Sequence, residues 1–327
     1  MRIIWLLALL LVVGCRHVPE DVLPVGVCAM PPEGRACATC FALNDTVYII
    51  GGCVENGKYS NTMMLYIPSN DQWINNIATP LQARVHGVAC DNATAAYVGL
   101  GYAGGGIYGD NTYLRDWWRF EPKGRIWKRL ADFPSDKTVS AVAFADEDYV
   151  WVGFGFNGFG NELWRYSIVD DAWESIPCHK TWPARLMAPV AAKVDGRFFQ
   201  GTGFLTRSRT DWWEFFPEDQ HWERRSSLPG AGRHNAACAA TERAVWVLGG
   251  WHYGDSLTDG YHFADILRYT PSDDQWTMCG TIPCGVTENG VAAGASSPKE
   301  LAFPVEFDAT VTAILGADGA GQFTVSD

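Results

Sequence analysis

The chain of 327 residues has few charged side chains, and acids outnumber bases by 37 to 25. The net charge of −12 argues against a nucleic-acid partner, because such binders need a basic surface that neutralises phosphates. No apolar run reaches the ~18 residues that a membrane-spanning helix requires. No segment shows the apolar period of a helix either. The 47% hydrophobic content therefore predicts a globular protein whose core is built from strands.

Tryptophan, by contrast, is abundant and periodic, with fifteen residues in all. Five times an aromatic residue precedes a tryptophan by seven positions, in the pairs Tyr66/Trp73, Phe120/Trp127, Tyr166/Trp173, Phe215/Trp222 and Tyr269/Trp276. A proline or acidic turn such as "TPSDDQ" lies between the two aromatics, so each pair is expected to face across a hairpin. The period near fifty residues indicates a repeat architecture.

One repeat reads as four strands. In the fifth repeat, a small-residue strand is expected over residues 233–241 and an apolar strand over 243–250. After a long loop, a third strand is expected over 264–269, and a fourth begins at Trp276.

The end of the second strand carries the signature of a known repeat. Gly51-Gly52 and Gly249-Gly250, each followed by an aromatic residue and then a tryptophan, resemble the kelch repeat. The middle three repeats depart from it, with a residue between the two glycines, as in Gly99-Leu100-Gly101. The resemblance implies an all-β propeller, in which each blade is a four-stranded sheet around a central channel.

Six blades are expected within a propeller domain of residues 24–327. Candidate strands at 290–297, 300–307 and 322–327 supply three strands of the last blade. The N-terminal segment 24–35 resembles the fourth strand of other repeats, so it is predicted to complete the last blade and close the ring. Closure would remove an open sheet edge.

The N-terminus resembles an export signal. Arg2 precedes an apolar run over residues 3–13, which is typical of a signal peptide, predicted here over 1–15. The letters "VVGC" resemble a bacterial lipobox, in which Cys15 would be acylated and residues 16–23 would form a tether. An ordinary secretory signal is the alternative. The predicted location is the bacterial cell envelope, periplasmic or at the cell surface, with the lipid as the protein's sole membrane contact.

Neither a metal nor another cofactor is expected. The sequence holds one CxxC pair, Cys37 and Cys40, with no second pair and no histidine pair at ligand spacing. The run from Gly99 to Gly104 satisfies G-x-G-x-x-G, but a nucleotide site needs a helix after it, and a strand is expected here. Small neighbours favour unpaired core thiols at Cys40, Cys90 and Cys238. Pairing of Cys28, Cys279 or Cys284 stays open.

Strand direction predicts where a ligand would bind. The start of the first strand and the loop between the second and third strands emerge on one face of the ring. The residues predicted to bind ligand on this face are Arg35, Arg84, His86, Tyr108, Arg185, Arg233, His234, Trp251 and Tyr253. The kelch resemblance implies that such arginines line a ligand pocket; the alternative is that they bond carbonyls between blades. Four acids precede the third-strand aromatic by four residues and are interpreted as loop caps: Asp116, Glu162, Asp211 and Asp265.

Two functions fit this face. The favoured hypothesis is a lipid-anchored binding module for a glycan or protein ligand. The alternative is a sugar epimerase or mutarotase, resembling the periplasmic kelch epimerases of sialic acid. In that enzyme, arginines would bind the substrate carboxylate and a histidine or acid would move the anomeric proton. No catalytic residue stands out from the repeat pattern.

Overall fold

The computed structural model describes residues 7–8, 25–26, 32–35, 37–44, 46–54, 57–104, 112–136, 138–155, 162–179, 183–240, 243–253, 260–263, 265–281, 310–315 and 321–326. The candidate strands at 290–297 and 300–307, together with Tyr108, Cys15, Cys28 and Cys284, lie outside these residues. Within the described ranges, no helix is long and apolar enough to cross a membrane.

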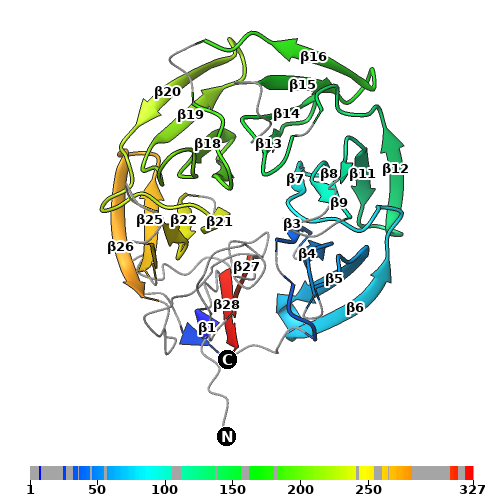
Figure 1. Cartoon of the computed structure of the whole chain (residues 1–327), viewed down its shortest axis with the longest axis horizontal. Coiled ribbons are helices and arrows are strands. Elements are labelled where there is room, and N and C mark those ends of the chain that lie inside the picture. Colours follow the sequence, from blue (N-terminus) through cyan, green and yellow to red (C-terminus); the bar gives the residue numbers. More distant parts are fainter. Residues whose placement is uncertain are drawn as a thin grey trace, which may run out of the picture.

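Five four-stranded antiparallel sheets are arranged in a ring (Figure 1). The first contains β3 (Thr39–Leu43), β4 (Thr46–Ile50), β5 (Thr62–Ile67) and β6 (Gln72–Ala78), and the second β7 (Val88–Asp91), β8 (Ala96–Gly99), β11 (Trp117–Glu121) and β12 (Ile126–Leu130). The third contains β13 (Val142–Ala145), β14 (Tyr149–Gly153), β15 (Leu163–Ser167) and β16 (Ala172–Ile176). The fourth contains β17 (Val190–Val194), β18 (Arg197–Gly201), β19 (Trp212–Phe216) and β20 (His221–Arg225), and the fifth β21 (Ala237–Ala240), β22 (Val245–Leu248), β25 (Asp265–Thr270) and β26 (Gln275–Thr281). In each sheet the first strand lies innermost and the last outermost, so the fold is a β-propeller and the predicted fold class is confirmed.

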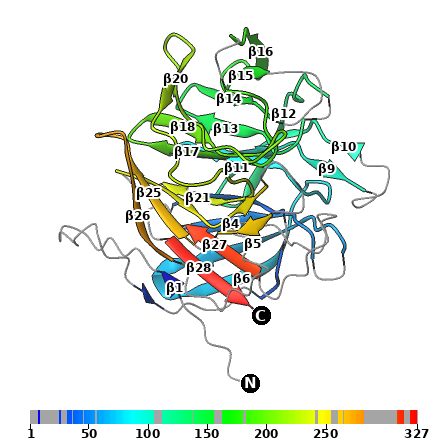
Figure 2. The ribbon, with the colours of Figure 1, turned by 60° about the vertical axis from the view of Figure 1, so that its left-hand side comes forward.

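The gap between the first and fifth sheets contains further short strands. The hairpin of β27 (Thr310–Leu315) and β28 (Gly321–Ser326) lies there in both views (Figures 1 and 2). Beside β28 lies β1 (Leu7–Ala8), which pairs with β2 (Val25–Gly26). β28 coincides with the strand expected at 322–327, and β2 falls within the segment 24–35. The count of six blades and closure by that segment stay predictions.

The five aromatic hairpins are confirmed. In every sheet the paired aromatics are direct cross-strand partners, such as Tyr166 with Trp173 and Phe215 with Trp222. Their ring centroids lie 4.7 to 5.0 Å apart. Cross-strand aromatic pairs of this kind contribute about 0.2–1 kcal/mol each.

The turn of the hairpin also joins neighbouring sheets. Where the aromatic residue is tyrosine, its hydroxyl donates to an aspartate five residues later, as from Tyr166 to Asp171 at 2.7 Å and from Tyr269 to Asp274 at 2.8 Å. Asp171 also accepts a bond from the backbone N–H of Ala131 on the preceding sheet. Asp274 likewise accepts from the N–H of Ser226. The second acid of the "PSDDQ" turn therefore forms a hydrogen bond that joins neighbouring blades.

The core lies between the sheets. One cluster combines Tyr97 and Trp117 of the second sheet with Val150 and Tyr166 of the third, all four of them fully buried. Its counterpart between the fourth and fifth sheets contains Trp212. In the second and fourth blades, a tryptophan at the start of the third strand thus fills the interface to the next blade.

The cysteines follow this packing only in part. Cys90 is buried between the second and third sheets, and Cys238 is half-buried against the fourth. Cys40 lies on the face of the first sheet that is turned away from the second, and its side chain is exposed. Burial nevertheless raises the pKa of the Cys40 thiol to about 12, so a core thiol at this position stays a prediction. All three thiols are free of disulfides.

Candidate functional site

A ring of left-handed residues marks the entrance to the innermost strands. Five residues, each fifteen positions before the second glycine of its repeat, have φ between 48° and 54°: Cys37, His86, Ser140, Ala188 and Asn235. We call them the entrance ring. Backbone bonds connect its members from sheet to sheet, from His86 N–H to Cys37 O, Ser140 N–H to His86 O, and Asn235 N–H to Ala188 O, at 3.0 to 3.2 Å.

The entrance ring holds conformations that side chains seldom adopt. Outside glycine, a positive φ is uncommon and is retained only where surrounding contacts impose it. All five side chains are half-buried, so they border the end of the ring rather than its core. Their recurrence shows that the conformation itself belongs to the fold. What differs between blades is the side chain, and in the second blade it is the imidazole of His86.

One ring nitrogen of His86 has a hydrogen-bond partner within the protein. Its Nδ1 lies 3.2 Å from the hydroxyl of Ser140, and its ring stacks on Tyr102 with centroids 5.6 Å apart. Burial lowers the pKa of His86 to about 4, so the imidazole is neutral at pH 7. Among the described residues, no side chain forms a hydrogen bond to Nε2. The site therefore presents a neutral imidazole nitrogen beside an aromatic face.

The tyrosine that stacks on His86 has two further tyrosines beside it. Tyr102 begins β9 (Tyr102–Ala103), which pairs with β10 (Thr112–Tyr113) in the hairpin between the second and third strands of the sheet. Tyr59 and Tyr113 lie 6.0 and 6.3 Å from the ring of Tyr102. Burial is the main cause that raises the pKa of Tyr102, so its hydroxyl stays protonated. We call Tyr59, Tyr102 and Tyr113 the tyrosine patch; rings with polar tips suit a ligand that alternates C–H and hydroxyl groups.

Arg84 belongs to the framework of the second blade. Its guanidinium is 1% exposed and binds both oxygens of Asp116 at 2.7 and 2.6 Å, and it also donates to the carbonyl of Leu100. Its backbone carbonyl accepts from Gly52 of the first repeat at 2.8 Å. The residue thus fastens one blade to the next. Burial raises the pKa of Asp116, but the bonds and charge of Arg84 outweigh it and leave that pKa below its ordinary value.

Arg233 repeats this arrangement in the fifth blade. It is fully buried, pairs with Asp265, donates to the carbonyl of Gly249 at 2.9 Å and lies 3.9 Å from the ring centroid of Phe263. Each guanidinium thus bonds a backbone carbonyl, but that carbonyl belongs to the arginine's own blade rather than to a neighbouring one. Contact of either one with a ligand stays a prediction.

Arg35 differs in its partner. The position of the aspartate is taken by Thr62, whose carbonyl and hydroxyl accept from Arg35 at 2.6 and 2.5 Å. The nearest carboxylate is that of Glu33, at 3.0 Å and far more exposed than the arginine itself. Burial is the main cause that lowers the pKa of Arg35. Of the three arginines, Arg35 is thus the one whose charge lacks a buried counterion in the described structure.

The remaining acids also have structural partners. Glu162 accepts from the indole N–H of Trp164 at 3.3 Å, and Asp211 binds Arg209 and Arg224. With Asp116 and Asp265 held by arginines, all four are anchoring groups, in line with their interpretation as loop caps. In the described ranges, no group of three His, Cys, Asp or Glu residues could hold a metal ion.

The predicted residues of the fifth blade come together below the surface. His234 is fully buried; its Nδ1 lies 3.0 Å from the hydroxyl of Ser208, and its ring stacks on Tyr253 at 5.5 Å. Trp251 packs edge-on against Tyr253 at 5.3 Å, and both are buried. Arg185 is half-buried, while Leu186 occupies the arginine position of the fourth blade.

Sequence reasoning found His86 but missed its neighbours. Ser140 and Tyr102 belong to different blades and lie 54 and 16 residues from His86. An alignment of the repeats does carry a signal, since Ser140 occupies the same position in its repeat as His86. It could not show that the two side chains meet.

Comparison with known proteins gives three kinds of likeness. The kelch motif family matches residues 34–75. The N-acetylneuraminate epimerases of Shigella flexneri serotype 5b and Escherichia coli K12 are each 26% identical over 213 residues, which are 63% of this chain and 50% of theirs. The epimerase of Yersinia enterocolitica is 24% identical over 57% of this chain and 43% of its own length.

A solved structure matches the fold over almost the whole chain. The structure of YjhT aligns with a TM-score of 0.63, covering 92% of this chain and 95% of that one at 14% identity. This likeness shows the fold alone. The chain spans about half the length of the curated relatives it matches.

Proposed function

Because the chain is a kelch-repeat β-propeller, we propose that it binds a carboxylated sugar at the His86 side of the ring entrance and speeds the exchange of the sugar's anomers. The observation that carries this proposal is the neutral imidazole of His86, whose ring stacks on Tyr102 of the tyrosine patch and whose Nε2 forms no side-chain hydrogen bond among the described residues. The substrate class comes from the relatives, whose names specify epimerisation of N-acetylneuraminate.

Exchange of sugar anomers requires proton transfers and the opening and closing of one bond. The anomeric hydroxyl loses a proton, the bond from the anomeric carbon to the ring oxygen breaks, and the ring oxygen gains a proton. Closure from the other face reverses these steps, so no electron and no net proton is transferred. A hydrogen-bond donor placed at the ring oxygen stabilises the charge that develops there. His86 supplies such a nitrogen, and the tyrosine hydroxyls supply further polar groups.

The charge distribution favours an anionic sugar at this place. The protein carries a net charge of −12, so attraction of a carboxylate needs a local positive charge. Arg84 and Arg233 are neutralised by Asp116 and Asp265. Arg35 faces the neutral Thr62 at that place, and its ion pair is with Glu33, a carboxylate far more exposed than the arginine; its blade also contributes Tyr59 to the tyrosine patch.

The test is an anomer-exchange measurement by NMR with N-acetylneuraminate. His86→Gln should slow the catalysed exchange by at least about a hundredfold, the usual minimum for a lost acid–base group. His221→Gln is the matched control, because His221 lies on β20, is exposed and bonds Asp219. Binding of the sugar without faster exchange would support the binding module favoured from the sequence. Absence of both binding and exchange would refute the proposal.

We further propose that the protein is exported and anchored through Cys15. Acyl labelling and membrane association of the full chain should both be lost in Cys15→Ser. A mature chain that starts at Cys15 would lack β1, which lies within the predicted signal, and would keep β2. Unchanged membrane association of the variant would contradict the anchor without bearing on the sugar site.

A further inference from the structure

We infer that Ser140 is a positioning residue for His86: its hydroxyl holds Nδ1 as an acceptor, so that Nε2 carries the ring proton and points it at the substrate oxygen. The catalytic meaning of this inference rests on the proposed function. The tautomer itself does not, since it follows from contacts within the protein.

The direction of the bond follows from the partners of the hydroxyl. The Ser140 Oγ and His86 Nδ1 are 3.2 Å apart, and either atom could donate. Among the described residues, Nδ1 is the one acceptor within bonding distance of that hydroxyl. If Nδ1 held the proton, the Ser140 hydroxyl would have no acceptor among the described residues. Donation from Ser140 to Nδ1 satisfies both groups.

The fifth blade contains a similar serine–histidine pair. Ser208 Oγ accepts from the backbone N–H of Tyr253 at 2.8 Å and lies 3.0 Å from His234 Nδ1. Burial is the main cause that lowers the pKa of His234 to about 3, so its ring is neutral. Donation from Ser208 to Nδ1 gives the hydroxyl an acceptor and leaves the ring proton on Nε2, which is buried and has no hydrogen-bond partner among the described residues. The protein thus combines a serine with a neutral histidine in two blades, but only His86 reaches the surface.

The backbone makes the His86–Ser140 bond rigid. Ser140 donates its N–H to the carbonyl of His86 at 3.2 Å, so two bonds join the residues. Both have a left-handed φ, 54° and 51°, which the entrance ring imposes. Stacking on Tyr102 fixes the plane of the imidazole. Because the second and third blades each contribute one partner, the packing of the two blades sets the aim of Nε2.

A neutral imidazole that donates from Nε2 polarises an oxygen rather than taking its proton. Triosephosphate isomerase provides a general precedent for a neutral histidine in such an electrophilic role. In anomer exchange the natural acceptor is the sugar ring oxygen, which gains charge as its bond to the anomeric carbon breaks. Removal of the anomeric proton then falls to another group or to water.

The variant that isolates this role is Ser140→Gly. It deletes the hydroxyl and keeps the left-handed backbone, which glycine adopts readily. Ala188→Gly is the matched control, because Ala188 holds the same position in the fourth blade, with φ of 48° and no hydroxyl. Any effect of added backbone freedom appears in both variants, whereas loss of the Nδ1 partner appears in one.

The first readout is ¹⁵N NMR of the imidazole, with His86→Gln used to assign its signals. The parent and Ala188→Gly should show Nδ1 unprotonated and Nε2 protonated, and Ser140→Gly should show a mixture of tautomers. Exchange of N-acetylneuraminate should then fall in kcat by about tenfold with little change in KM, since orientation rather than binding is lost.

The outcomes separate the two proposals. A protonated Nδ1 in the parent, or an unchanged tautomer in Ser140→Gly, would overturn the positioning role whatever the activity. An equal loss of kcat in Ala188→Gly would assign the effect to the backbone and overturn it as well. The expected tautomer shift in a protein that exchanges no sugar would uphold the positioning of His86 and refute the proposed function.

Discussion

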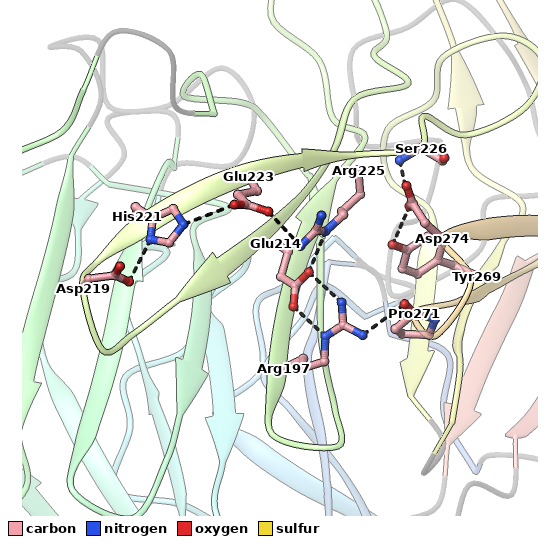
Figure 3. A network of polar contacts seen from close by, with 10 residues as sticks. All are labelled: Arg197, Glu214, Asp219, His221, Glu223, Arg225, Ser226, Tyr269, Pro271 and Asp274. Atoms are coloured by element: carbon pink, nitrogen blue, oxygen red, sulfur yellow. Dashed lines mark hydrogen bonds and ion pairs between the residues drawn. The ribbon is translucent and has the colours of Figure 1, made fainter.

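Replacement of Glu214 tests the reasoning about blade-to-blade contacts. Figure 3 shows its carboxylate between Arg197 and Arg225, with bonds of 2.6 and 2.7 Å to the first and 2.6 Å to the second. Arg197 also donates to the carbonyl of Pro271 on the fifth sheet at 3.0 Å. The carboxylate therefore organises a bond between the fourth and fifth blades. We expect Glu214→Gln to weaken it while nearly preserving the volume of the side chain.

The magnitude follows from which groups remain buried. Glu214 is 2% exposed, whereas Arg197 and Arg225 are 36% and 24% exposed. Loss of one partner from a fully buried ion pair costs about 3–5 kcal/mol. Here the two guanidinium groups can regain water, so screening reduces the cost to about 2–3 kcal/mol. At about 2–4 °C per kcal/mol for a domain of this class, the melting temperature should fall by about 5–10 °C.

The assay is thermal and urea unfolding at pH 7, beside the control Glu223→Gln. Glu223 bonds the same Arg225 at 2.9 Å but is half-exposed, so its loss should change stability by less than about 0.5 kcal/mol. Burial raises the pKa of Glu214, yet the bonds from both arginines leave it below the ordinary 4.5. Its contribution is therefore present above pH 4.5 and disappears as the pH falls through the lower folded pKa. Equal melting of both variants at pH 7 would refute the argument.

Three further predictions concern the framework and the histidines. Arg84→Met should lower the free energy of unfolding by about 3–5 kcal/mol in urea, because Asp116 and the Leu100 carbonyl lose their buried partner. The control Arg129→Met removes an exposed ion pair with Asp132 and should change stability little. An Arg84→Met variant that unfolds like the parent but no longer binds sugar would instead assign Arg84 to the ligand. Tyr166→Phe should cost about 0.5–1.5 kcal/mol through its bond to Asp171, and a urea midpoint equal to that of the parent would contradict the turn as a bond between blades. His86 and His234 have folded pKa values of about 4 and about 3, below the ordinary 6.5, so between these values and pH 6.5 the unfolded chain binds more protons than the folded one. The urea midpoint should therefore fall as the pH is lowered from 6.5 toward 4. His86→Gln should make this pH dependence weaker, and an unchanged pH dependence would argue against a neutral His86.

The candidate site could be predicted only in outline. Strand direction placed His86 and the arginines on one face, and the repeat alignment located each of them. Whether each arginine serves the framework or a ligand could not be predicted from the sequence, because it depends on whether a carboxylate pairs with the guanidinium in the fold. Asp116 lies 32 residues after Arg84, whereas Thr62 lies 27 residues after Arg35.

The two partners nevertheless occupy the same place in their repeats. Thr62 precedes Tyr66 by four positions, as Asp116 precedes Phe120. The shorter loop of the first repeat therefore changes the spacing but not the register. The alignment could name the residue at that place in each blade, but only the folded sheet shows that this place lies against the guanidinium.

The repeat, the four strands of each unit and the aromatic pair across each hairpin can all be predicted from the sequence. These features are local, since a turn of fixed length brings Tyr269 and Trp276 together whatever surrounds them. The folded structure is needed to show which polar side chains already have a partner within the protein and which could bind a ligand. Asp116 pairs with the guanidinium of Arg84, and the hydroxyl of Ser140, from the neighbouring blade, lies within hydrogen-bonding distance of His86 Nδ1. Such contacts depend on how blades pack around a common axis, and that geometry is set by the buried tryptophans between sheets rather than by any local pattern.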